Sequence, residues 1–239
     1  MLGTIVNSIT VIVGCLVGLI VKGRLTEKIS ITIMNGLALC TLYIGISGAL
    51  NGGDTLIMII SVAIGALIGE IIDIDKWLNK LGYYLEGKFK NKKESNISIA
   101  EGFITSSLLF CVGAMAIVGS LESGLRGNHD TLFTKSILDG ISSIIFTSSL
   151  GIGVIFSAVT VFVYQGAITL GAGLLSGVLS TSVITNMSAV GGLLIVGLAL
   201  NMLGVTKIKI ANLLPAIDLP IIHQIFKFNY IEKVVKYVT

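Results

Sequence analysis

The feature that most constrains this chain is a stretch of 67 residues, from Gly140 to Thr206, that contains no Asp, Glu, Lys or Arg. A helix needs about 20 predominantly apolar residues to cross a bilayer, so this stretch is long enough for two or more crossings. Across the whole chain, 54% of the residues are hydrophobic and only 12% are charged. These features exclude an ordinary soluble domain and predict an all-α, polytopic membrane helical bundle.

Seven segments have the length and composition of membrane-spanning helices. Each is expected to be helical or buried in protein, because lipid offers backbone groups no hydrogen-bond partners. An eighth element, residues 205–222, is short and contains Pro215 and Pro220. Because proline removes a backbone donor and clashes with the preceding turn, this element is predicted to be a re-entrant segment or a half-helix. The seven predicted spans are residues 3–21, 30–50, 55–72, 102–121, 132–150, 152–170 and 183–203.

The basic residues gather on one predicted side of the membrane. They follow the first, third and seventh spans and recur in the C-terminal tail, and together these places hold 14 of the 16 Lys and Arg residues. Only Arg126 and Lys135 fall on the opposite side. The positive-inside rule makes the richer side cytoplasmic. We therefore expect the N-terminus outside and the C-terminus in the cytoplasm.

The chain also contains a weak internal repeat at an offset of 150 residues. Gly3 and Ile5 match Gly153 and Ile155, and residues 49–51 match residues 199–201. Five crossings separate the two copies, so they would point in opposite directions, as the inverted repeats of secondary transporters do. Residues 1–90 form the predicted first repeat, residues 91–150 two central spans, and residues 151–239 the second repeat. Strict inversion would place the C-terminus outside, and here we follow the charge distribution instead.

Two segments are amphipathic rather than uniformly apolar. After the third span, Ile74, Trp77 and Leu78 begin a helical pattern that is interrupted by lysines, and the tail from Ile221 repeats the pattern. Such helices are typical of the headgroup plane, where anionic lipid attracts their basic face. The alternatives are packing on protein or a dimer contact. The expected partners are the lipid bilayer and, through such a contact, a second copy of the chain.

Polar residues inside predicted spans are candidate functional groups. An ionisable side chain there costs roughly 2.5–3.5 kcal/mol on insertion scales. Asp139 lies inside the fifth predicted span, Lys135 is one turn earlier on the same face, and Ser143 continues that face. This polar stripe could bind a cation, carry a proton or form a Lys–Asp pair. The alternative is a structural pair that faces another helix.

Four amides complete the predicted solute-binding set. Asn7 lies in the first predicted span, Gln165 in the sixth and Asn186 in the seventh. Asn212 precedes Pro215, where a helix break would leave carbonyl groups that suit cations, although the same segment could be an ordinary loop. Asn7, Gln165 and Asn186 can also bond between helices, and for any one of these three alone that structural interpretation is favoured.

Several signatures of enzymes and binding modules are absent from the sequence. It contains neither a GxxxxGK[ST] loop for ATP nor an HExxH zinc motif. His129 lies in a predicted outer loop and His223 in the tail, and the three cysteines occupy separate spans, so no metal site is expected. A net charge of +3 does not indicate a nucleic-acid partner. We expect no enzymatic activity and no cofactor.

Six motifs resemble a known bacterial membrane family. They are GTIVNS at 3–8, LLFCVGAMAIVGS at 108–120, TKSILDG at 134–140, VYQGAITL at 163–170, AVGGLLIVGLALNMLG at 189–204 and KIKIANLLPA at 207–216. The family is catalogued as domain of unknown function 554, and its members often carry the label of inner-membrane transporter. The resemblance covers nearly the whole chain. It implies an integral protein of the bacterial inner membrane, but no particular substrate, and it places Lys135, Asp139, Gln165 and Asn212 inside family motifs.

Three functional hypotheses follow from these observations. The favoured one is a secondary transporter of a small solute or ion, in which inverted halves rock about a midplane site and Asp139 is the binding or coupling carboxylate. The second is a membrane scaffold or sensor that docks a cytoplasmic partner through its amphipathic helices. The third is an ion channel lined by polar groups from several copies.

Overall fold

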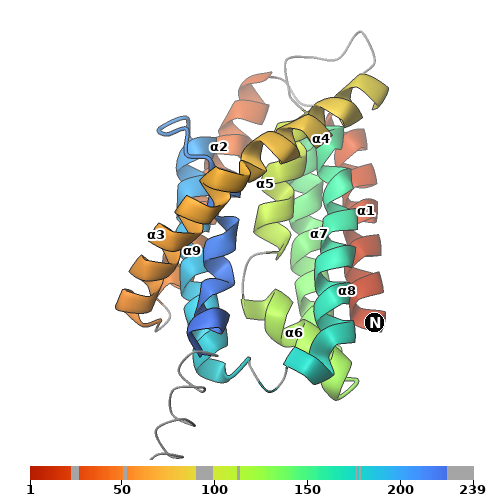
Figure 1. The fold of residues 1–239 in the computed structure, drawn as a ribbon. Coiled ribbons are helices and arrows are strands. Elements are labelled where there is room, and N and C mark those ends of the chain that lie inside the picture. Colours follow the sequence, from red (N-terminus) through yellow and green to blue (C-terminus); the bar gives the residue numbers. More distant parts are fainter. Residues whose placement is uncertain are drawn as a thin grey trace, which may run out of the picture.

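The computed structural model describes residues 1–22, 27–50, 53–89, 99–111, 114–175, 177 and 179–224. Within these ranges the regular structure is entirely helical, as predicted (Figure 1). The α-helices are α1 (Leu2–Lys22), α2 (Glu27–Leu50), α3 (Thr55–Ile72), α4 (Ile74–Phe89), α5 (Ile99–Cys111), α6 (Ala114–Leu125), α7 (Asp130–Leu150), α8 (Ser157–Leu175) and α9 (Thr181–Met202). Two 3-10 helices, η1 (Ile152–Phe156) and η2 (Ile210–Ile217), precede α8 and follow α9.

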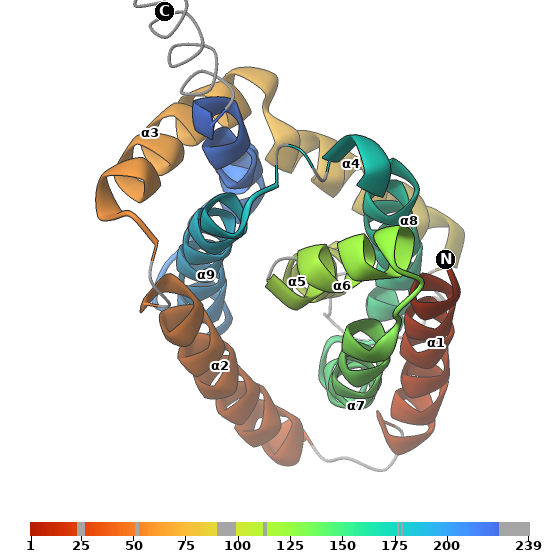
Figure 2. The ribbon, with the colours of Figure 1, turned by 90° about the horizontal axis from the view of Figure 1, so that it is seen from below.

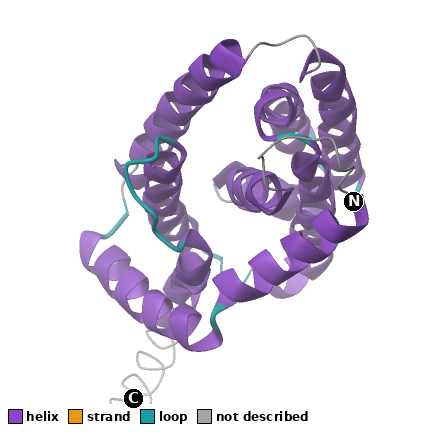
Figure 3. Cartoon of the chain, turned by 90° about the horizontal axis from the view of Figure 1, so that it is seen from above, coloured by secondary structure: helices purple, strands orange, loops and turns teal. Residues whose placement is uncertain are grey.

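Local signals set the ends of α3. The side chain of Asp54 accepts hydrogen bonds from the backbone N–H groups of Leu56 and Ile57, which satisfies donors that a helix start leaves unpaired. At the other end Asp73 adopts the left-handed conformation, with φ of 55°, and donates its N–H to the Gly69 carbonyl. The chain changes direction at this residue. The amphipathic α4 therefore lies across the end of the bundle, as Figures 1 and 3 show.

The helices form two groups with α5 and α6 between them (Figure 2). In one group α1 packs against α7 and α8, and in the other α2 packs against α9 and α3 packs against η2. Glycines permit the close approach of α1 to α7. Gly14 and Gly18 of α1 face the backbone carbonyls of Gly140 and Ile144, and a Cβ atom at either glycine would overlap that carbonyl. Small residues on a helix face allow this kind of contact within a membrane.

Among the described residues, five helical segments are long and apolar enough to cross a membrane. They are Leu2–Val21, Ile31–Leu50, Thr55–Ile72, Ile152–Leu174 and Thr181–Met202, and they coincide with the first, second, third, sixth and seventh predicted spans. The prediction of seven spans is not confirmed. The fourth predicted span is divided between α5 and α6, whose axes differ by 60° and which together could make a sixth crossing.

The fifth predicted span corresponds to α7, which is 21 residues long. Its charged residues Asp130, Lys135 and Asp139, together with several serines, make it less apolar than a typical span. Instead of facing lipid, α7 buries much of its polar side against other helices, including Lys135, Asp139, Ser143 and Thr147. A polar helix is tolerated at this depth because protein surrounds it.

The proline-containing element is η2, which lies along α3. Gly65 and Gly69 of α3 are placed against Ala216 and the Asn212 backbone so closely that a Cβ atom at either glycine would overlap η2. The chain then continues as a helix over residues 219–224. The segment α3 is itself long and apolar enough to span a membrane, and η2 packs along it.

The described chain ends on the same side of the bundle as Met1 (Figure 1). Pro220 and His223 line one pocket with Asp54, which precedes α3, and with Thr181, which begins α9. Residues 219–224 lie at this end because the packing of η2 on α3 directs the chain across the bundle. The side of the membrane on which the C-terminus lies stays a prediction. The lysine-bearing tail from residue 225, and with it most of the predicted C-terminal amphipathic helix, lies outside the described residues.

Apolar side chains fill two cores and also cover the outside of the bundle. One core lies around α9, η2 and α6, and the second around α1, α7 and α8. The outer faces of α1, α2, α3 and α8 expose large apolar side chains, including Ile9, Ile20, Leu39, Leu67 and Leu174. Apolar surface of this extent is suited to lipid rather than water.

Candidate functional site

An ion pair forms the centre of the candidate site. On α7 the Lys135 Nζ atom donates to both carboxylate oxygens of Asp139, at 2.8 Å to Oδ1 and 2.7 Å to Oδ2. The two residues are 7% and 6% exposed. Asp139 lies about 14 Å from the start of α7 at 1.5 Å per residue, close to the middle of the helix. The i,i+4 spacing that predicted this pair is sufficient to bring the two side chains together.

Two amides from other helices extend the pair into a network. Asn7 of α1 donates through Nδ2 to Asp139 Oδ2 at 2.9 Å and to Gln165 Oε1 of α8 at 3.3 Å. Both amides are fully buried. Three helices therefore meet at one polar cluster, which we call the Asp139 network and define as Asn7, Lys135, Asp139 and Gln165. Four of the seven predicted site residues belong to it.

The Asp139 network leaves two buried amide atoms without a partner among the described residues. Asn7 Oδ1 is an unpaired acceptor and Gln165 Nε2 an unpaired donor. Buried polar atoms are normally paired, since an unmade hydrogen bond costs about 1–3 kcal/mol. The network therefore has spare hydrogen-bonding capacity next to the carboxylate.

The ion pair faces a cavity of about 830 Å³ between α2, α7 and α9, with the ends of α5 and α6 contributing. Among the described residues, Lys135 and Asp139 are the only charged ones that line it, and the hydroxyls of Tyr43, Ser47 and Ser142 are among its polar groups. The cavity reaches Thr181 and Thr185, which also line the pocket of Asp54 and His223 at the Met1 end. The cavity therefore extends toward that end.

The other three predicted site residues do not join the network. Ser143 Oγ donates to the backbone carbonyl of Asp139 at 2.7 Å, so its hydroxyl is used within α7. Asn186 Oδ1 accepts from the Asp54 backbone N–H at 2.7 Å. Asn186 therefore ties α9 to the start of α3.

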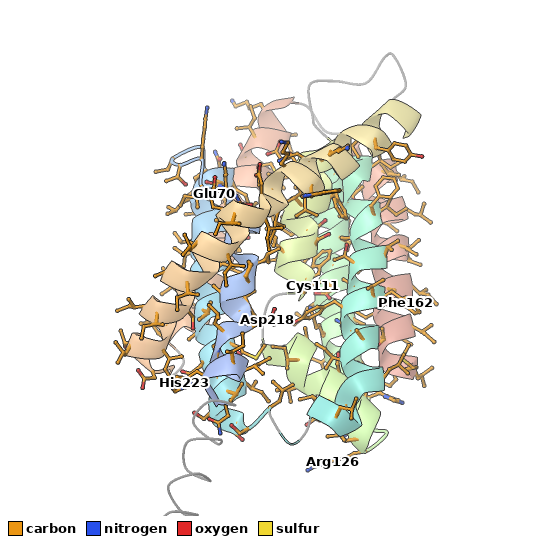
Figure 4. All side chains as sticks on the ribbon, viewed as in Figure 1. Glu70, Cys111, Arg126, Phe162, Asp218 and His223 are labelled. Carbon is orange, nitrogen blue, oxygen red and sulfur yellow. The ribbon has the colours of Figure 1, made fainter. Side chains whose placement is uncertain are left out.

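Asn212 joins a separate polar cluster at the opposite end. Its Oδ1 accepts from the Asp75 backbone N–H at 2.7 Å, and its Nδ2 donates to Glu70 Oε2 at 2.6 Å. Lys209 donates to Glu70 Oε1 at 2.8 Å, and this hydrogen bond raises the pKa of the lysine. The cluster fixes η2 to the junction of α3 and α4, and Figure 4 shows Glu70 at that end.

Sequence reasoning missed a second carboxylate at the depth of the bundle, Asp218. It follows η2 and lines a cavity of about 280 Å³ with Cys111, Thr160 and Tyr164 (Figure 4). This second cavity shares Ile104 and Leu108 with a pocket at the end where Glu70 lies, whose lining includes Lys207 and Lys209. The sequence did contain a signal for Asp218, because this aspartate lies between Pro215 and Pro220 in an element that was predicted to be re-entrant or a half-helix.

The last turn of α5 separates the two cavities. Phe110 lines the larger cavity and Cys111, the next residue, lines the smaller one. Phe110 is 1% exposed and packs edge-to-face on Phe146 of α7, with ring centroids 6.2 Å apart. The larger cavity therefore lies on the Phe110 side of this turn and extends toward the Met1 end, and the smaller cavity lies on the Cys111 side and extends toward the Glu70 end.

Within the residues that the structure describes, no three His, Cys, Asp or Glu side chains are grouped so that they could hold a metal ion. The charged chemistry of the site consists of the Lys135–Asp139 pair and the separate carboxylate of Asp218. This set can exchange protons, bind a small ion or hold a polar solute.

Comparison with known proteins identifies relatives along nearly the whole chain. The family model described as Protein of unknown function (DUF554) matches residues 2–225, which confirms the resemblance drawn from the motifs. The chain is 34% identical over 224 residues to "Uncharacterized membrane protein YdfK" of Bacillus subtilis (strain 168), covering 92% of this chain and 94% of that protein. It is 29% identical over 218 residues to "Uncharacterized protein YqgA" of Escherichia coli (strain K12), covering 90% and 93%. No solved structure matches.

Proposed function

The chain belongs to the membrane protein family of unknown function described as DUF554, and from the geometry of its site we propose that it is a secondary transporter of a small solute or ion. The observation that carries the proposal is the buried Lys135–Asp139 pair, which lies near the middle of α7 and lines a cavity of about 830 Å³. Ionisable groups inside a membrane bundle are costly and are retained where solutes, ions or protons pass.

The two cavities support a transport path with access from one side at a time. The Asp139 cavity is approached from the Met1 end, and the Asp218 cavity from the opposite side, with Phe110 and Cys111 between them. The helix that contributes this barrier is discontinuous, since α5 and α6 meet at an angle of 60°. Discontinuous helices near the midplane are typical of the binding sites of secondary transporters.

The pairing of helices supports an inverted repeat. At the offset of 150 residues, α1 corresponds to the η1–α8 segment, α2 to α9, and α3 to η2 with residues 219–224. Each of these elements packs against its own counterpart. Two halves related in this way could rock against each other about the Asp139 network. By the positive-inside rule the Met1 end faces outward, so the larger cavity opens outward in this conformation.

The proposal is tested by uptake into proteoliposomes. Purified wild type and Asp139→Asn would be reconstituted and supplied with a panel of radiolabelled cations, anions, sugars and amino acids, with and without proton or sodium gradients. Wild type is expected to accumulate at least one solute against its gradient. Vesicles with Asp139→Asn are expected to accumulate at least 10-fold less of this solute, because the variant lacks the carboxylate that couples transport to the gradient.

Asp130→Asn is the matched control, since Asp130 is an exposed aspartate in the first turn of the same helix. Vesicles with Asp130→Asn should take up the transported solute as well as wild-type vesicles do. If no solute crosses with wild type under any gradient, or if Asp139→Asn transports as well as wild type, the transporter proposal is wrong. Single-channel currents in planar bilayers would identify a channel instead. A soluble partner recovered by cross-linking, without any transport, would identify a scaffold.

A further inference from the structure

The charge balance of the larger cavity indicates what kind of solute it binds. Lys135 and Asp139 neutralise each other, and no other charged residue in the described part of the chain lines the cavity. Two of the three N–H groups of Lys135 are used on Asp139, which leaves one donor for a ligand. A cation bound at Asp139 would have to compete with an ammonium group that already holds both carboxylate oxygens. An anion bound at Lys135 meets no such competitor.

An anion at Lys135 would change the state of Asp139. With the lysine charge matched by the anion, the carboxylate would become the unbalanced charge of a buried site, and buried charges without partners are strongly disfavoured. Uptake of one proton by Asp139 removes that charge. The pair plus one anion plus one proton is again neutral, so the loaded and empty sites have the same net charge.

The two amides of the Asp139 network can accommodate this proton. A protonated carboxyl is a hydrogen-bond donor and needs an acceptor, and Asn7 Oδ1 is an acceptor without a partner among the described residues. If the Asn7 amide rotates by about half a turn, its Oδ1 accepts a hydrogen bond from the protonated carboxyl of Asp139. Gln165 Nε2, the unpaired donor, can then turn to the same oxygen. The network thus has a set of hydrogen bonds for each protonation state of Asp139.

The other titratable groups near the pair are uncharged in their ordinary states. Cys111 on α5 lies within electrostatic range of Lys135 and Asp139, Tyr43 on α2 lines the same cavity, and Cys15 on α1 faces Ser143 and Thr147. The helices α1 and α8 present the neutral amides Asn7 and Gln165. Proton uptake by Asp139 therefore balances the anion without help from another charged side chain of these helices.

We propose that the larger cavity binds a small monovalent oxyanion, of the carboxylate or sulfonate class, on Lys135 together with one proton on Asp139. The proposal rests on the transporter function and makes it an electroneutral proton–anion symport. A volume of about 830 Å³ accommodates a small organic molecule. Hydroxyls of Tyr43, Ser47 and Ser142 are available for the rest of such a solute.

Infrared difference spectroscopy on the full chain in nanodiscs tests the binding step. Methanesulfonate is the probe, because it is a monovalent oxyanion without a carbonyl group. Exchanging sodium sulfate for sodium methanesulfonate at constant pH is expected to increase the carbonyl band of a protonated carboxylic acid. The increase should be absent in Asp139→Asn and present in Asp130→Asn. Lys135→Met should show the protonated band before any anion is added and no further change.

Proteoliposomes containing a pH-sensitive dye test the coupling. An inward methanesulfonate gradient should acidify the interior of wild-type vesicles, with one proton entering per anion, and should not do so in Asp139→Asn vesicles. Methanesulfonic acid is a strong acid, so almost none of it is present in the neutral form and passive entry of neutral acid does not contribute. Size-exclusion profiles of each variant confirm that it is folded.

The possible failures of the two proposals are distinguishable. The proposed anion site is wrong if the carbonyl band does not respond to the anion, or if it responds instead to replacement of sodium by choline. This conclusion holds even if the uptake panel finds a transported cation. If the band responds but no panel solute crosses under any gradient, the anion site stands and the transporter function is wrong. Methanesulfonate entry without acidification overturns the proton coupling.

Discussion

At the residue scale, Asp139 has three hydrogen bonds that come from two helices. Lys135 supplies two of them and Asn7 the third. The carboxylate depends on the lysine for charge balance, because the pair is buried and no other charged side chain of the described ranges lines the cavity that it faces. Removal of one partner of such a pair is more damaging than removal of both.

Replacement of Lys135 tests this dependence. Lys135→Met is expected to lower the free energy of unfolding by up to about 3–5 kcal/mol where Asp139 stays ionised, and by less where the carboxyl takes up a proton. Lys135→Met combined with Asp139→Leu should recover most of the loss, because no unpaired charge remains. Unfolding in mixed micelles, followed through the fluorescence of Trp77, measures both. A double variant as unstable as the single one would contradict the argument.

The sequence predicts the pair but not its surroundings. Residues four apart on a helix must be neighbours, so Lys135 and Asp139 could be placed together from spacing alone. Asn7 is 132 residues from Asp139 along the chain, and only the packing of α1 on α7 brings the two together. In the sequence, Asn186 and Asn212 could not be distinguished from Asn7, because all three are amides in predicted membrane elements. Their hydrogen bonds to distant backbone groups could not be foreseen from their spans.

At the element scale, the contact of η2 with α3 depends on two glycines. Gly69 faces the carbonyl of Asn212 and Gly65 faces Ala216, without room for a methyl group at either position. The contact holds η2 beside a membrane-spanning helix, and it places Asp218 at the smaller cavity.

Gly69→Ala and Gly36→Ala form a matched pair. A Cβ atom at Gly69 would overlap the Asn212 backbone, whereas a Cβ atom at Gly36, in α2, would meet nothing within 4 Å. We expect Gly69→Ala to lower the thermal unfolding midpoint and Gly36→Ala to leave it unchanged or raise it, since alanine favours the helix by about 0.5–1 kcal/mol. Differential scanning of the detergent-solubilised variants measures this. Equal midpoints would show that η2 does not pack as described.

Most helices were predictable as elements, and the exceptions have physical causes. The helices α1, α2, α3 and α9 could be predicted from long apolar segments, because a helix that crosses a bilayer needs about 20 apolar residues. The division between α5 and α6 was missed since residues 102–121 remain apolar across it, and hydropathy does not register a change of direction. The prolines did identify the broken element at η2.

At the scale of the whole molecule, the described chain begins and ends on the same side. Figure 4 shows Arg126 and His223 at the Met1 end and Glu70 at the other. The tail lysines, which follow the described residues, favour a cytoplasmic C-terminus, whereas strict inversion of the repeat favours the outer side. Hydropathy could not resolve the conflict, because η2 is shorter and less regular than a complete span.

Cysteine accessibility in sealed cells tests the topology. In a Cys40→Ser background, Arg126→Cys and His223→Cys are expected to react with a membrane-impermeant maleimide from the outside. Lys207→Cys should react only after permeabilisation, because it lies at the opposite end with Lys209 and Glu70. Labelling of positions 207 and 223 from the same side would overturn the path of η2 across the bundle.

The thin partition at Phe110 also has an electrical consequence. If water fills both cavities, the electrical potential of the solution on each side of the membrane extends to the corresponding face of the last turn of α5. The transmembrane voltage would then fall across a few ångströms of protein instead of the whole hydrocarbon layer. A charge that passes this single turn would gain nearly the full electrical energy of crossing, about 2.3 kcal/mol per 100 mV.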